Sequence, residues 1–271
     1  MNLTDIIVRP ISKMEAIELI FEFHYSKIMP KLTEHYLGAF LDGKLVGVMT
    51  LGWGVRPVHT IKLLFPSMER KDYYEIGKMC MDEAMPKNSE SVFLSKVIQW
   101  LKDNTNCKIL FTWADGILGK PGYVYQAANF LYGGFIWTDL YISDTGEKIH
   151  PRTSQGMGAK DGTKYGRRPT KALLATKGWS HYRGKQFRYV YFTCDKKERK
   201  RLLRDSTVDW NQPYPKAAAL EWKKQDLSTG EWDVATSITY DQTASNKNNA
   251  TVAVNSRKVK SAQRLRQFFD F

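Results

Sequence analysis

The sequence predicts a mixed α/β fold, in which a central sheet is flanked by helices. Apolar runs with partial strand-like alternation are interleaved with segments of helical periodicity. The middle of the chain has the order strand–helix–strand, which is typical of a sheet with a crossover connection. A content of 42% hydrophobic and 13% aromatic residues in 271 is ample for a packed core, which excludes disorder of the whole chain.

The individual elements follow from periodicity and turn residues. Residues 12–23 predict a helix, with Ser12 as a candidate cap. Residues 35–53 predict a β-hairpin, because two apolar runs flank Asp42-Gly43, a dipeptide that readily adopts the positive φ of a tight turn. The same rules predict a loop at 54–62, a strand at 73–81, a turn at 85–90, helices at 89–104, 123–131 and 196–204, and strands at 107–115, 135–143 and 186–194.

Basic residues are concentrated in one segment of the chain. Lys and Arg number 41 against 28 Asp and Glu, a net charge of +13, and residues 148–204 hold 17 of the bases and 3 of the acids. That segment carries +14, whereas the rest, with 24 bases and 25 acids, carries −1. Such a segment favours a polyanion such as DNA over a merely solvated face, because each cation that meets a phosphate releases a counterion. A membrane surface is less favoured, because no basic helix with a clean apolar face accompanies the segment.

These patterns predict three regions along the chain. Residues 1–147 are the expected catalytic core, and residues 148–220 are the expected basic extension that packs on the core and contacts DNA. After Pro213-Tyr214-Pro215 the composition turns to Ser, Thr, Asn and Lys, so that residues 221–271 are expected to be a linker or disordered tail with a short basic helix near its end.

Cysteine usage and hydropathy bear on the compartment. Cys80, Cys107 and Cys194 are odd in number and widely spaced, which argues against a disulfide scaffold and fits a reducing cytoplasm. No apolar run approaches the roughly 20 residues of a membrane span. The five histidines lie in different segments without the pairwise spacing of metal ligands, so no metal site is predicted.

Two sets of polar residues at the ends of elements could carry chemistry. One set begins at the end of strand 73–81, with Met79, Cys80 and Met81, and continues through a turn to Asn88, Ser89 and Ser91. The turn ends at a helix N-terminus, where unpaired N–H groups can bind an anion such as a pyrophosphate. An ordinary N-cap is the alternative.

Asp115 follows an apolar strand, and Tyr125 lies ten residues on, with Gln126 and Asn129. A carboxylate and a phenol can act as general base and acid; a capping Asp and a half-buried core Tyr are the alternative. Trp53 and Arg56 could stack on a base and hold a phosphate, or could be a buried Trp beside an Arg in solvent.

Three runs resemble phage proteins of the Mom DNA-modification family. They are HYLGAFLDGKLVGVMTLGWGVRP, EIGKMCMDEAMPKNSESVFL and FTWADGILGKPGYVYQAANFLYGGFIW, and the Asp of WAD followed by G-x-x-Y-Q-A-x-N-F is the most specific part. The resemblance extends over residues 19–152, continues weakly through the basic segment and stops near Leu220.

The resemblance implies a fold related to the GCN5-related N-acyltransferases (GNAT) and transfer of a carbamoylmethyl group to adenine N6 in double-stranded DNA, which hides restriction sites in the infected bacterial cytoplasm. It implies catalytic roles for Asp115 and Tyr125 and, on weaker matches, for Ser91, His24 and Tyr25. It implies an acyl-CoA-type donor held by the turn, with Met79, Cys80, Met81, Asn88, Ser89, Gln126 and Asn129 as binding residues. Acyltransferases of this fold usually have glycines in that turn, and MPKNSE has none, which leaves the donor open.

A flipped-out adenine would stack on Trp53 or Tyr36, with Arg56 on the backbone. The further DNA-binding candidates in the basic segment are Arg152, Arg167, Arg168, Lys171, Arg183, Lys185 and Arg188. Two other functions compete with this one. The chain could be a non-catalytic DNA-binding protein that shields DNA, or a conventional GNAT enzyme acting on a protein or small amine.

Overall fold

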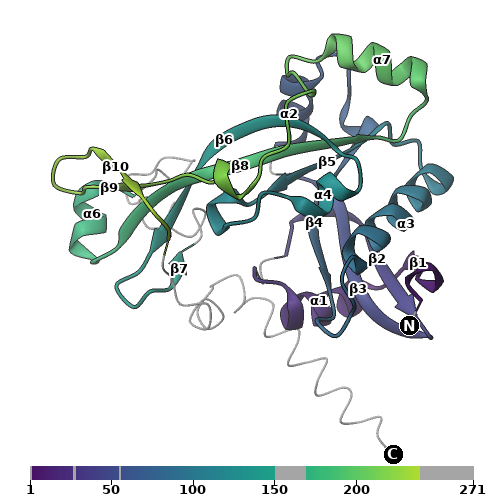
Figure 1. The fold of residues 1–271 in the computed structure, drawn as a ribbon, viewed down its shortest axis with the longest axis horizontal. Coiled ribbons are helices and arrows are strands. Elements are labelled where there is room, and N and C mark those ends of the chain that lie inside the picture. Colours follow the sequence, from purple (N-terminus) through teal and green to yellow (C-terminus); the bar gives the residue numbers. More distant parts are fainter. Residues whose placement is uncertain (1, 27–28, 55, 150–168, 239–271) are drawn as a thin grey trace, which may run out of the picture. The chain divides into compact units, whose positions relative to one another are not determined.

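The computed structural model describes residues 2–26, 29–54, 56–149 and 169–238. The chain forms two compact units, the first with described residues from 2–136 and 185–220, the second from 137–184 and 221–238. Figure 1 shows the elements along the chain. Those of the first unit are η1 (Leu3–Asp5), β1 (Ile7–Pro10), α1 (Lys13–Phe23), β2 (Leu32–Leu41), β3 (Lys44–Trp53), α2 (Pro57–Leu64), η2 (Arg70–Asp72), β4 (Tyr73–Met81), α3 (Ser89–Asn104), β5 (Ile109–Ala114), η3 (Gly116–Leu118), α4 (Tyr123–Ala127), α7 (Lys196–Asp205) and η4 (Ala217–Ala219).

Two long strands, β6 (Leu131–Ile142) and β8 (Ser180–Phe192), contribute residues to both units. The second unit also contains β7 (Lys148–Ile149), α6 (Lys171–Thr176), β9 (Trp222–Gln225) and β10 (Trp232–Ala235). The units therefore divide the chain at other positions than the boundaries expected from composition. The physical reason is that a long strand carries its two halves into different packing environments, which a change in composition along the chain does not reveal.

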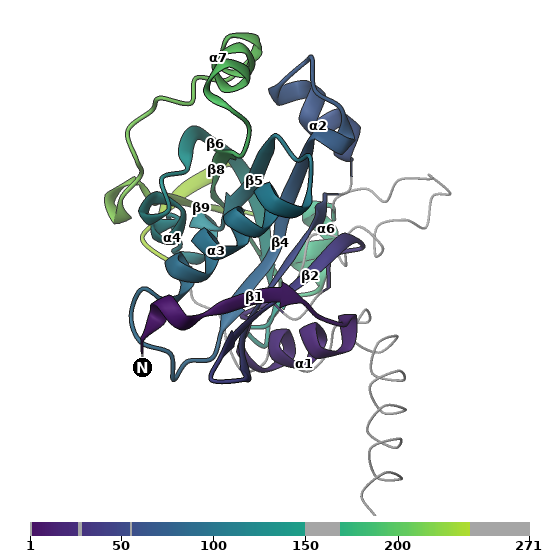
Figure 2. The ribbon, with the colours of Figure 1, turned by 90° about the vertical axis from the view of Figure 1, so that its right-hand side faces the viewer.

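The sheet of the first unit has the strand order β1-β2-β3-β4-β5-β8-β6. The pairs β1–β2, β2–β3, β3–β4 and β5–β8 are antiparallel, whereas β4 and β5 are parallel, with α3 as the connection between them. Helices flank this sheet, and in Figure 2 α1 and α3 lie on opposite faces of it. The mixed α/β architecture expected from the sequence is thus confirmed.

Each face of the sheet has its own hydrophobic core. Because neighbouring residues of a strand point to opposite faces, Leu110 of β5 packs in one core and Phe111 in the other. The first core contains Phe93 and Val97 of α3, and the second contains Phe65 at the end of α2. Both faces are therefore buried, which explains why the strands are mostly apolar runs rather than strictly alternating ones.

The turn and cap signals of the sequence correspond to real structure. Asp42 and Gly43 have φ of 51° and 77° and join β2 to β3, as the dipeptide predicts. Ser12 caps α1 through a capping box: the Ser12 Oγ accepts from the Glu15 N–H at 3.2 Å, and the Glu15 carboxylate accepts from the Ser12 N–H at 2.7 Å. Helix α3 covers residues 89–104, the range that the periodicity predicts.

Two expectations about irregular segments are wrong. Part of the expected loop at 54–62 is helix α2, which begins with Pro57 in its first turn and buries Ile61 and Leu64. Part of the expected linker is the antiparallel hairpin β9–β10, whose β9 pairs with residues 182–184 of β8. Its turn is closed by Asp226, whose Oδ1 accepts from the Ser228 N–H at 2.7 Å, and by Gly230 with φ of 90°. Turn chemistry over a few residues thus outweighs the polar composition that suggested disorder.

Candidate functional site

Strands β4 and β5 run side by side only at their beginnings. Tyr73–Glu75 pair in register with Ile109–Phe111, and neither strand pairs with the other beyond these residues. A bulge at Gly77 bends β4 in the same region, since Thr50 is opposite Lys78 while Leu51 is opposite Ile76. The end of β5 therefore has unpaired backbone on the side of β4, at the carboxyl end of a strand, where sites of α/β sheets gather.

Asp115 lies at this end of β5 and is held by two side chains. The Tyr25 hydroxyl donates to its Oδ2 at 2.5 Å, and the Gln186 amide donates to its Oδ1 at 3.0 Å. The backbone oxygen of Asp115 accepts from the Leu118 and Lys120 N–H groups at 2.8 and 3.1 Å, which fixes the turn η3. Both carboxylate oxygens thus have donors from distant parts of the chain, which fixes the orientation of the carboxylate.

Tyr25 is itself positioned by its neighbours. His24, 7% exposed, ends α1 and stacks on the Tyr25 ring with centroids 4.3 Å apart, and its Nδ1 accepts from the Ser26 N–H at 2.9 Å. The Lys120 ammonium lies 4.1 Å from the centroid of the Tyr25 ring. The structure therefore brings together Asp115, Tyr25 and His24, which the sequence proposed as catalytic, and it adds Lys120.

Tyr125 lies on the face of β5 that α3 and α4 cover. It packs against Phe130 and Tyr189, each with its ring centroid 5.5 Å away, and its hydroxyl interacts with Thr112 of β5. Burial, aided by the nearby charges of Asp115 and Glu90, raises the pKa of Tyr125 to about 12, although the hydrogen bond with Thr112 lowers it. The phenol therefore remains protonated and can donate a hydrogen bond at any pH up to about 10.

The pKa of Tyr125 gives a pH-dependent stability that can be measured. Because the folded pKa lies above that of an unfolded tyrosine, the stabilisation is complete below pH 10 and is lost as pH rises from 10 towards 12. We expect the free energy of unfolding of the wild type to fall in this window relative to that of Tyr125→Phe. Urea titrations of both proteins between pH 8 and 11.5, followed by circular dichroism, check this. Parallel curves for the two proteins would contradict a buried neutral phenol.

The turn before α3 has the backbone of an anion site rather than a side-chain cap. Asn88 is left-handed, with φ of 72°, and its side chain makes no cap hydrogen bond. Within the described ranges, the N–H groups of Glu90 and Ser91 meet no acceptor. The Ser89 and Ser91 hydroxyls donate to the carbonyl oxygens of Pro86 and Asn88, at 2.5 and 2.8 Å. Two backbone donors are thus available, while the serine hydroxyls expected to bind or react have backbone partners.

The residues of β4 that the sequence proposes as cofactor-binding residues point to different faces of the sheet. Met79 and Met81 belong to the core under α3, whereas Cys80, 6% exposed, directs its Sγ at the Leu19 carbonyl oxygen of α1 at 3.9 Å. Burial raises the pKa of the Cys80 thiol to about 12, so that it is not a nucleophile at neutral pH. Only the two methionines lie on the side of the sheet that carries Tyr125.

Gln126 and Asn129 have structural contacts in place of cofactor contacts. The Gln126 amide donates to the Tyr189 hydroxyl at 3.0 Å and to the Pro215 oxygen at 2.9 Å, and its Oε1 accepts from Lys216 at 3.2 Å. Asn129, with φ of 58°, makes the turn out of α4. Both residues thus have structural roles around α4, and their binding of a cofactor stays a prediction.

Trp53 lies at the other end of the sheet from Asp115. Its neighbour Gly52 pairs with Glu75 near the start of β4, and the start of β4 lies beside the start of β5. Asp115, by contrast, follows the end of β5. Six strand residues separate the two ends, or about 20 Å. The Trp53 ring is covered by Arg70 at 3.9 Å and by Tyr74 at 5.4 Å, and its indole N–H donates to the backbone oxygens of both Arg70 and Tyr73. The expectation that Trp53 stacks on an adenine held at Asp115 is therefore wrong.

Tyr36 and Arg56 differ in where the structure places them relative to Asp115. Tyr36 is paired with Thr50, which pairs with Lys78, and these residues face the α1 side of the sheet, opposite to Tyr125. Arg56 is exposed and begins α2, at the Trp53 end of the sheet. Arg56 is therefore at the end of the sheet opposite to Asp115. Lys78, in the same row as Tyr36, donates to the Ser26 oxygen at 2.9 Å, next to Tyr25, so that stacking of an adenine on Tyr36 stays a prediction.

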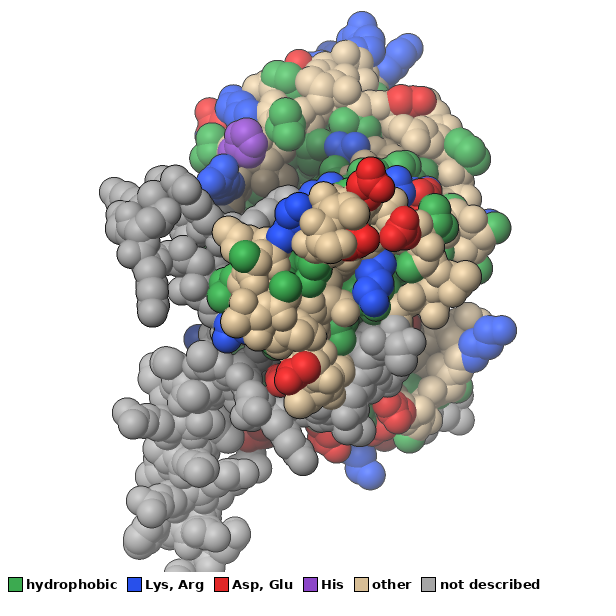
Figure 3. All heavy atoms as spheres, turned by 90° about the vertical axis from the view of Figure 1, so that its left-hand side faces the viewer, with side chains coloured by type: hydrophobic (Ala, Val, Ile, Leu, Met, Phe, Trp, Pro, Cys, Tyr) green, Lys and Arg blue, Asp and Glu red, His purple; other side chains and the backbone are tan. Residues whose placement is uncertain are grey.

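The basic residues proposed for DNA have varied surroundings. In the first unit, Lys185 extends over the Phe135 ring at 4.7 Å and donates to the Ala219 oxygen at 3.3 Å, and burial lowers the pKa of half-buried Arg188. In the second unit, Arg183 binds Asp139 at 2.9 Å, and Lys171 donates to the Thr229 oxygen at 3.2 Å. Figure 3 shows one face on which described Lys and Arg side chains (blue) lie among Asp and Glu side chains (red). Arg152, Arg167 and Arg168 lie outside the described residues.

The described part of the chain has neither a cluster of metal ligands nor a long apolar helix. No three His, Cys, Asp or Glu side chains there gather closely enough to hold a metal ion. None of the helices described is both long and apolar enough to span a bilayer.

Gln186 and Lys120 are the residues of the site that sequence reasoning missed. Gln186 is 71 positions away from Asp115 and is brought to it by the antiparallel pairing of β8 with β5, in which Phe187 is opposite Ala114. Lys120 is close to Asp115 in sequence and could have been found from the turn in GILGKPG. No local pattern distinguishes Gln186 from other polar strand residues.

Together these features define a class of protein: a mixed α/β protein whose two parallel strands part beside a fixed carboxylate and a neutral phenol, an arrangement suited to moving protons on a bound substrate. The chain belongs to the Mom protein family, whose profile matches residues 5–216. The resemblance noted in the sequence is thereby confirmed.

Known proteins with similar sequences or structures are of two kinds. The methylcarbamoylase mom of Escherichia phage Mu is 30% identical over 214 residues, which cover 77% of this chain and 83% of that protein. Aminoglycoside acetyltransferase AAC(6')-Ib with ribostamycin and coenzyme A is a similar solved structure, with 12% identity, a TM-score of 0.38 and coverage of 49% of this chain and 86% of that one. A GNAT-family acetyltransferase of Streptococcus pneumoniae has 12% identity, a TM-score of 0.36 and coverage of 69% and 98%. Likenesses with TM-scores this low have no bearing on function.

Proposed function

We propose that the protein is a phage DNA-modification enzyme that transfers a carbamoylmethyl-type group to adenine N6 in DNA and so protects the DNA from host restriction in the bacterial cytoplasm. The observation that carries the proposal is the Asp115 carboxylate, fixed by Tyr25 and Gln186 where β4 and β5 part. Membership of the Mom family, with a relative in phage Mu that bears the name methylcarbamoylase, supports the same reaction class.

Adenine N6 needs a base because its lone pair is delocalised into the ring. In the reaction a new bond forms between N6 and the electrophilic carbon of the activated donor, and the bond from that carbon to the leaving group breaks, the leaving group taking the electron pair. Asp115 accepts the N6 proton as attack proceeds. Tyr25 and Gln186 hold the carboxylate in one orientation, which reduces the entropy cost of reaching the reactive geometry.

Tyr125 is the donor to negative charge that develops on the other reactant. Because its pKa is raised to about 12, the phenol is neutral and donates a hydrogen bond at physiological pH. Asp115 is close enough for its charge to act on Tyr125, so that one group can accept a proton while the other donates a hydrogen bond.

The turn before α3 fits one phosphate group of a donor such as an acyl-CoA. The fit rests on the left-handed backbone of Asn88 and the two N–H groups of Glu90 and Ser91, in a turn without glycine. These backbone groups and the positive end of α3 would hold the phosphate. Such a donor would supply the activated carbon; Met79 and Met81 would line its path on the β4 side.

The target base must leave the duplex to reach Asp115. In a duplex the N6 amine is paired and stacked, so an adenine has to be flipped out before its amine meets the carboxylate. Lys120, whose ammonium lies over the Tyr25 ring, is next to a residue that holds Asp115 and is placed to neutralise a phosphate of the flipped nucleotide.

Analysis of DNA nucleosides tests the proposal and separates it from its rivals. The protein is expressed in bacteria with a plasmid, the DNA is digested, and the nucleosides are identified by mass spectrometry. We expect an adenosine with the added mass of a carbamoylmethyl group, and we expect it to be missing from cells that carry an empty vector. Unaltered nucleosides together with tight DNA binding would support a protein that only shields DNA. Coenzyme A binding without a DNA adduct would support an acyltransferase acting on other amines.

A further inference from the structure

A second basic surface lies at the end of the sheet opposite to Asp115. Helices α2 and α7 lie at the same end of the first unit in both Figure 1 and Figure 2, because α7 follows the end of β8, where Phe192 is opposite Ile109 at the start of β5. The distance along β5 from Ile109 to Asp115 is about 20 Å. We call the exposed side of α2, η2 and α7 the α2–α7 surface.

Helix α7 presents a stripe of cations to solvent. It contains six Lys or Arg and two acids in ten residues. Lys197, Lys200 and Arg204 are exposed and follow each other at i, i+3 and i+7, so that they lie along one face of the helix, while Leu202 is buried. Like charges at this spacing repel each other, and a polyanion would remove that cost.

The acids of the α2–α7 surface are already paired with groups of the protein. Glu198 binds Arg201 at 2.7 Å and Lys108 at 3.4 Å, and these cations lower the pKa of Glu198 to about 2. Asp205 accepts from the Ser67 hydroxyl at 2.6 Å and from its N–H at 2.9 Å. The Ser206 hydroxyl donates to the Leu64 oxygen of α2 at 2.8 Å. These contacts fix α7 against α2 and leave the stripe of cations uncompensated.

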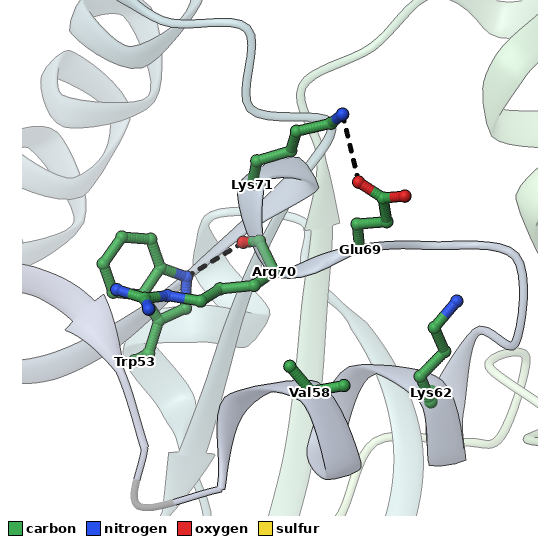
Figure 4. Close-up of a pocket in the computed structure, with 6 residues that line it drawn as sticks. All are labelled: Trp53, Val58, Lys62, Glu69, Arg70 and Lys71. Carbon is green, nitrogen blue, oxygen red and sulfur yellow. Dashed lines mark hydrogen bonds and ion pairs between the residues drawn. The ribbon is translucent and has the colours of Figure 1, made fainter.

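Beside α2, a hollow continues the same surface. It is lined by Trp53, Val58, Lys62, Glu69, Arg70 and Lys71. Figure 4 shows the Arg70 side chain lying over the Trp53 ring, at 3.9 Å from its centroid, with Val58 and Lys62 of α2 across from it. Stacking holds the guanidinium in one place, so that little entropy is lost when it binds a phosphate.

We propose that the α2–α7 surface is a second DNA-binding site that holds the phosphate backbone about half a helical turn from the modified adenine. The inference rests on the proposed function insofar as DNA is the substrate held at Asp115. A separation of about 20 Å corresponds to about six base pairs at 3.4 Å each. The site has no part in the chemistry. It determines the length of duplex that the enzyme grips, and it gives a role to α7, which holds six of the 17 bases of residues 148–204.

The test compares two triple variants that remove the same charge. The stripe variant removes the cations of α7 and carries Lys197→Ala, Lys200→Ala and Arg204→Ala. The control variant removes three exposed lysines elsewhere in the first unit and carries Lys13→Ala, Lys44→Ala and Lys96→Ala. Full-length proteins, checked for folding by circular dichroism, are titrated with fluorescent duplexes of about 30 and about 10 base pairs at several salt concentrations. Adenine modification of both duplexes is measured in parallel.

For the stripe variant we expect at least tenfold weaker binding of the long duplex, with the slope of log affinity against log salt reduced by about 3, because each lost phosphate contact removes about 0.9. The short duplex, centred on one adenine, cannot reach the α2–α7 surface. The stripe variant should therefore bind and modify this duplex as the wild-type protein does. The proposal would be overturned if both triple variants lost the same affinity for the long duplex, or if neither lost any. It would also be overturned if the stripe variant lost the same affinity for both duplexes. Competition by polyglutamate as strong as that by DNA would indicate an acidic protein partner instead. A wild type that neither binds nor modifies DNA would refute the proposed function itself.

Discussion

Asp115→Asn is expected to lower the rate of adenine modification by about 10²- to 10⁴-fold, the range over which a positioned general base acts. The substitution keeps the size of the side chain and an oxygen that can accept from Gln186, but it removes the charge and the ability to take a proton from N6. The rate is measured by mass spectrometry of nucleosides from duplex DNA incubated with purified protein and a cell extract that supplies the donor.

Two measurements keep the Asp115 result specific. Binding of duplex DNA by the variant should be unchanged or slightly tighter, since one negative charge is lost near the substrate. Asp103→Asn is the matched control, because Asp103 is an exposed carboxylate of α3 that accepts only a surface hydrogen bond from Gln99 at 2.9 Å. An Asp115→Asn protein that modifies DNA as fast as Asp103→Asn would exclude Asp115 as the base.

Trp210→Ala is expected to destabilise the first unit by about 3–5 kcal/mol, the usual cost of removing a large buried aromatic side chain. Trp210 is 2% exposed, and its ring stacks on Phe65 at 5.5 Å with an angle of 2° between the rings. A Cβ at Gly133 would meet the Trp210 ring at 2.4 Å, which shows how closely the backbone of β6 approaches it. Urea denaturation followed by circular dichroism measures the loss.

A conservative variant separates packing from hydrogen bonding at this position. Trp210→Phe retains a ring against Phe65 but loses the indole N–H that donates to the Ser206 hydroxyl at 2.8 Å, so we expect a loss of about 1–2 kcal/mol. Val234→Ala, at a side chain that is 79% exposed, should have an effect within about 0.5 kcal/mol. Equal stabilities of Trp210→Ala and wild type would show that this core does not hold the unit together.

Local signals in the sequence determined most of the elements that carry the site. The hairpin around Asp42-Gly43, the Ser12 cap and helix 89–104 depend on residues that are neighbours in the chain, and for such elements the local physics agrees with the tertiary structure. Helix α2 was missed because its glycine- and proline-rich start is typical of loops, although Pro57 is also a favourable first-turn residue.

The site was predicted where its residues adjoin element ends and missed where they do not. Asp115 and Tyr125 are recognisable from the sequence because one follows an apolar strand and the other lies in the short helix that comes next. Gln186 belongs to the site only because β8 is paired with β5 in a particular register. Trp53 was placed at the wrong end of the sheet, because the sequence does not say which end of β3 lies beside the end of β5.

The sequence by itself determined the mixed α/β class, the resemblance to the Mom family, the carboxylate and phenol at the ends of their elements, and the concentration of positive charge. The tertiary structure decided which residues hold Asp115 and where the described charges lie: Arg183 and Lys171 belong to one unit, α7 belongs to the other, and α7 comes to the end of the sheet opposite to the carboxylate. The physical reason is that local propensity and composition depend on neighbours in the chain, whereas strand pairing and register bring together side chains that are far apart in it.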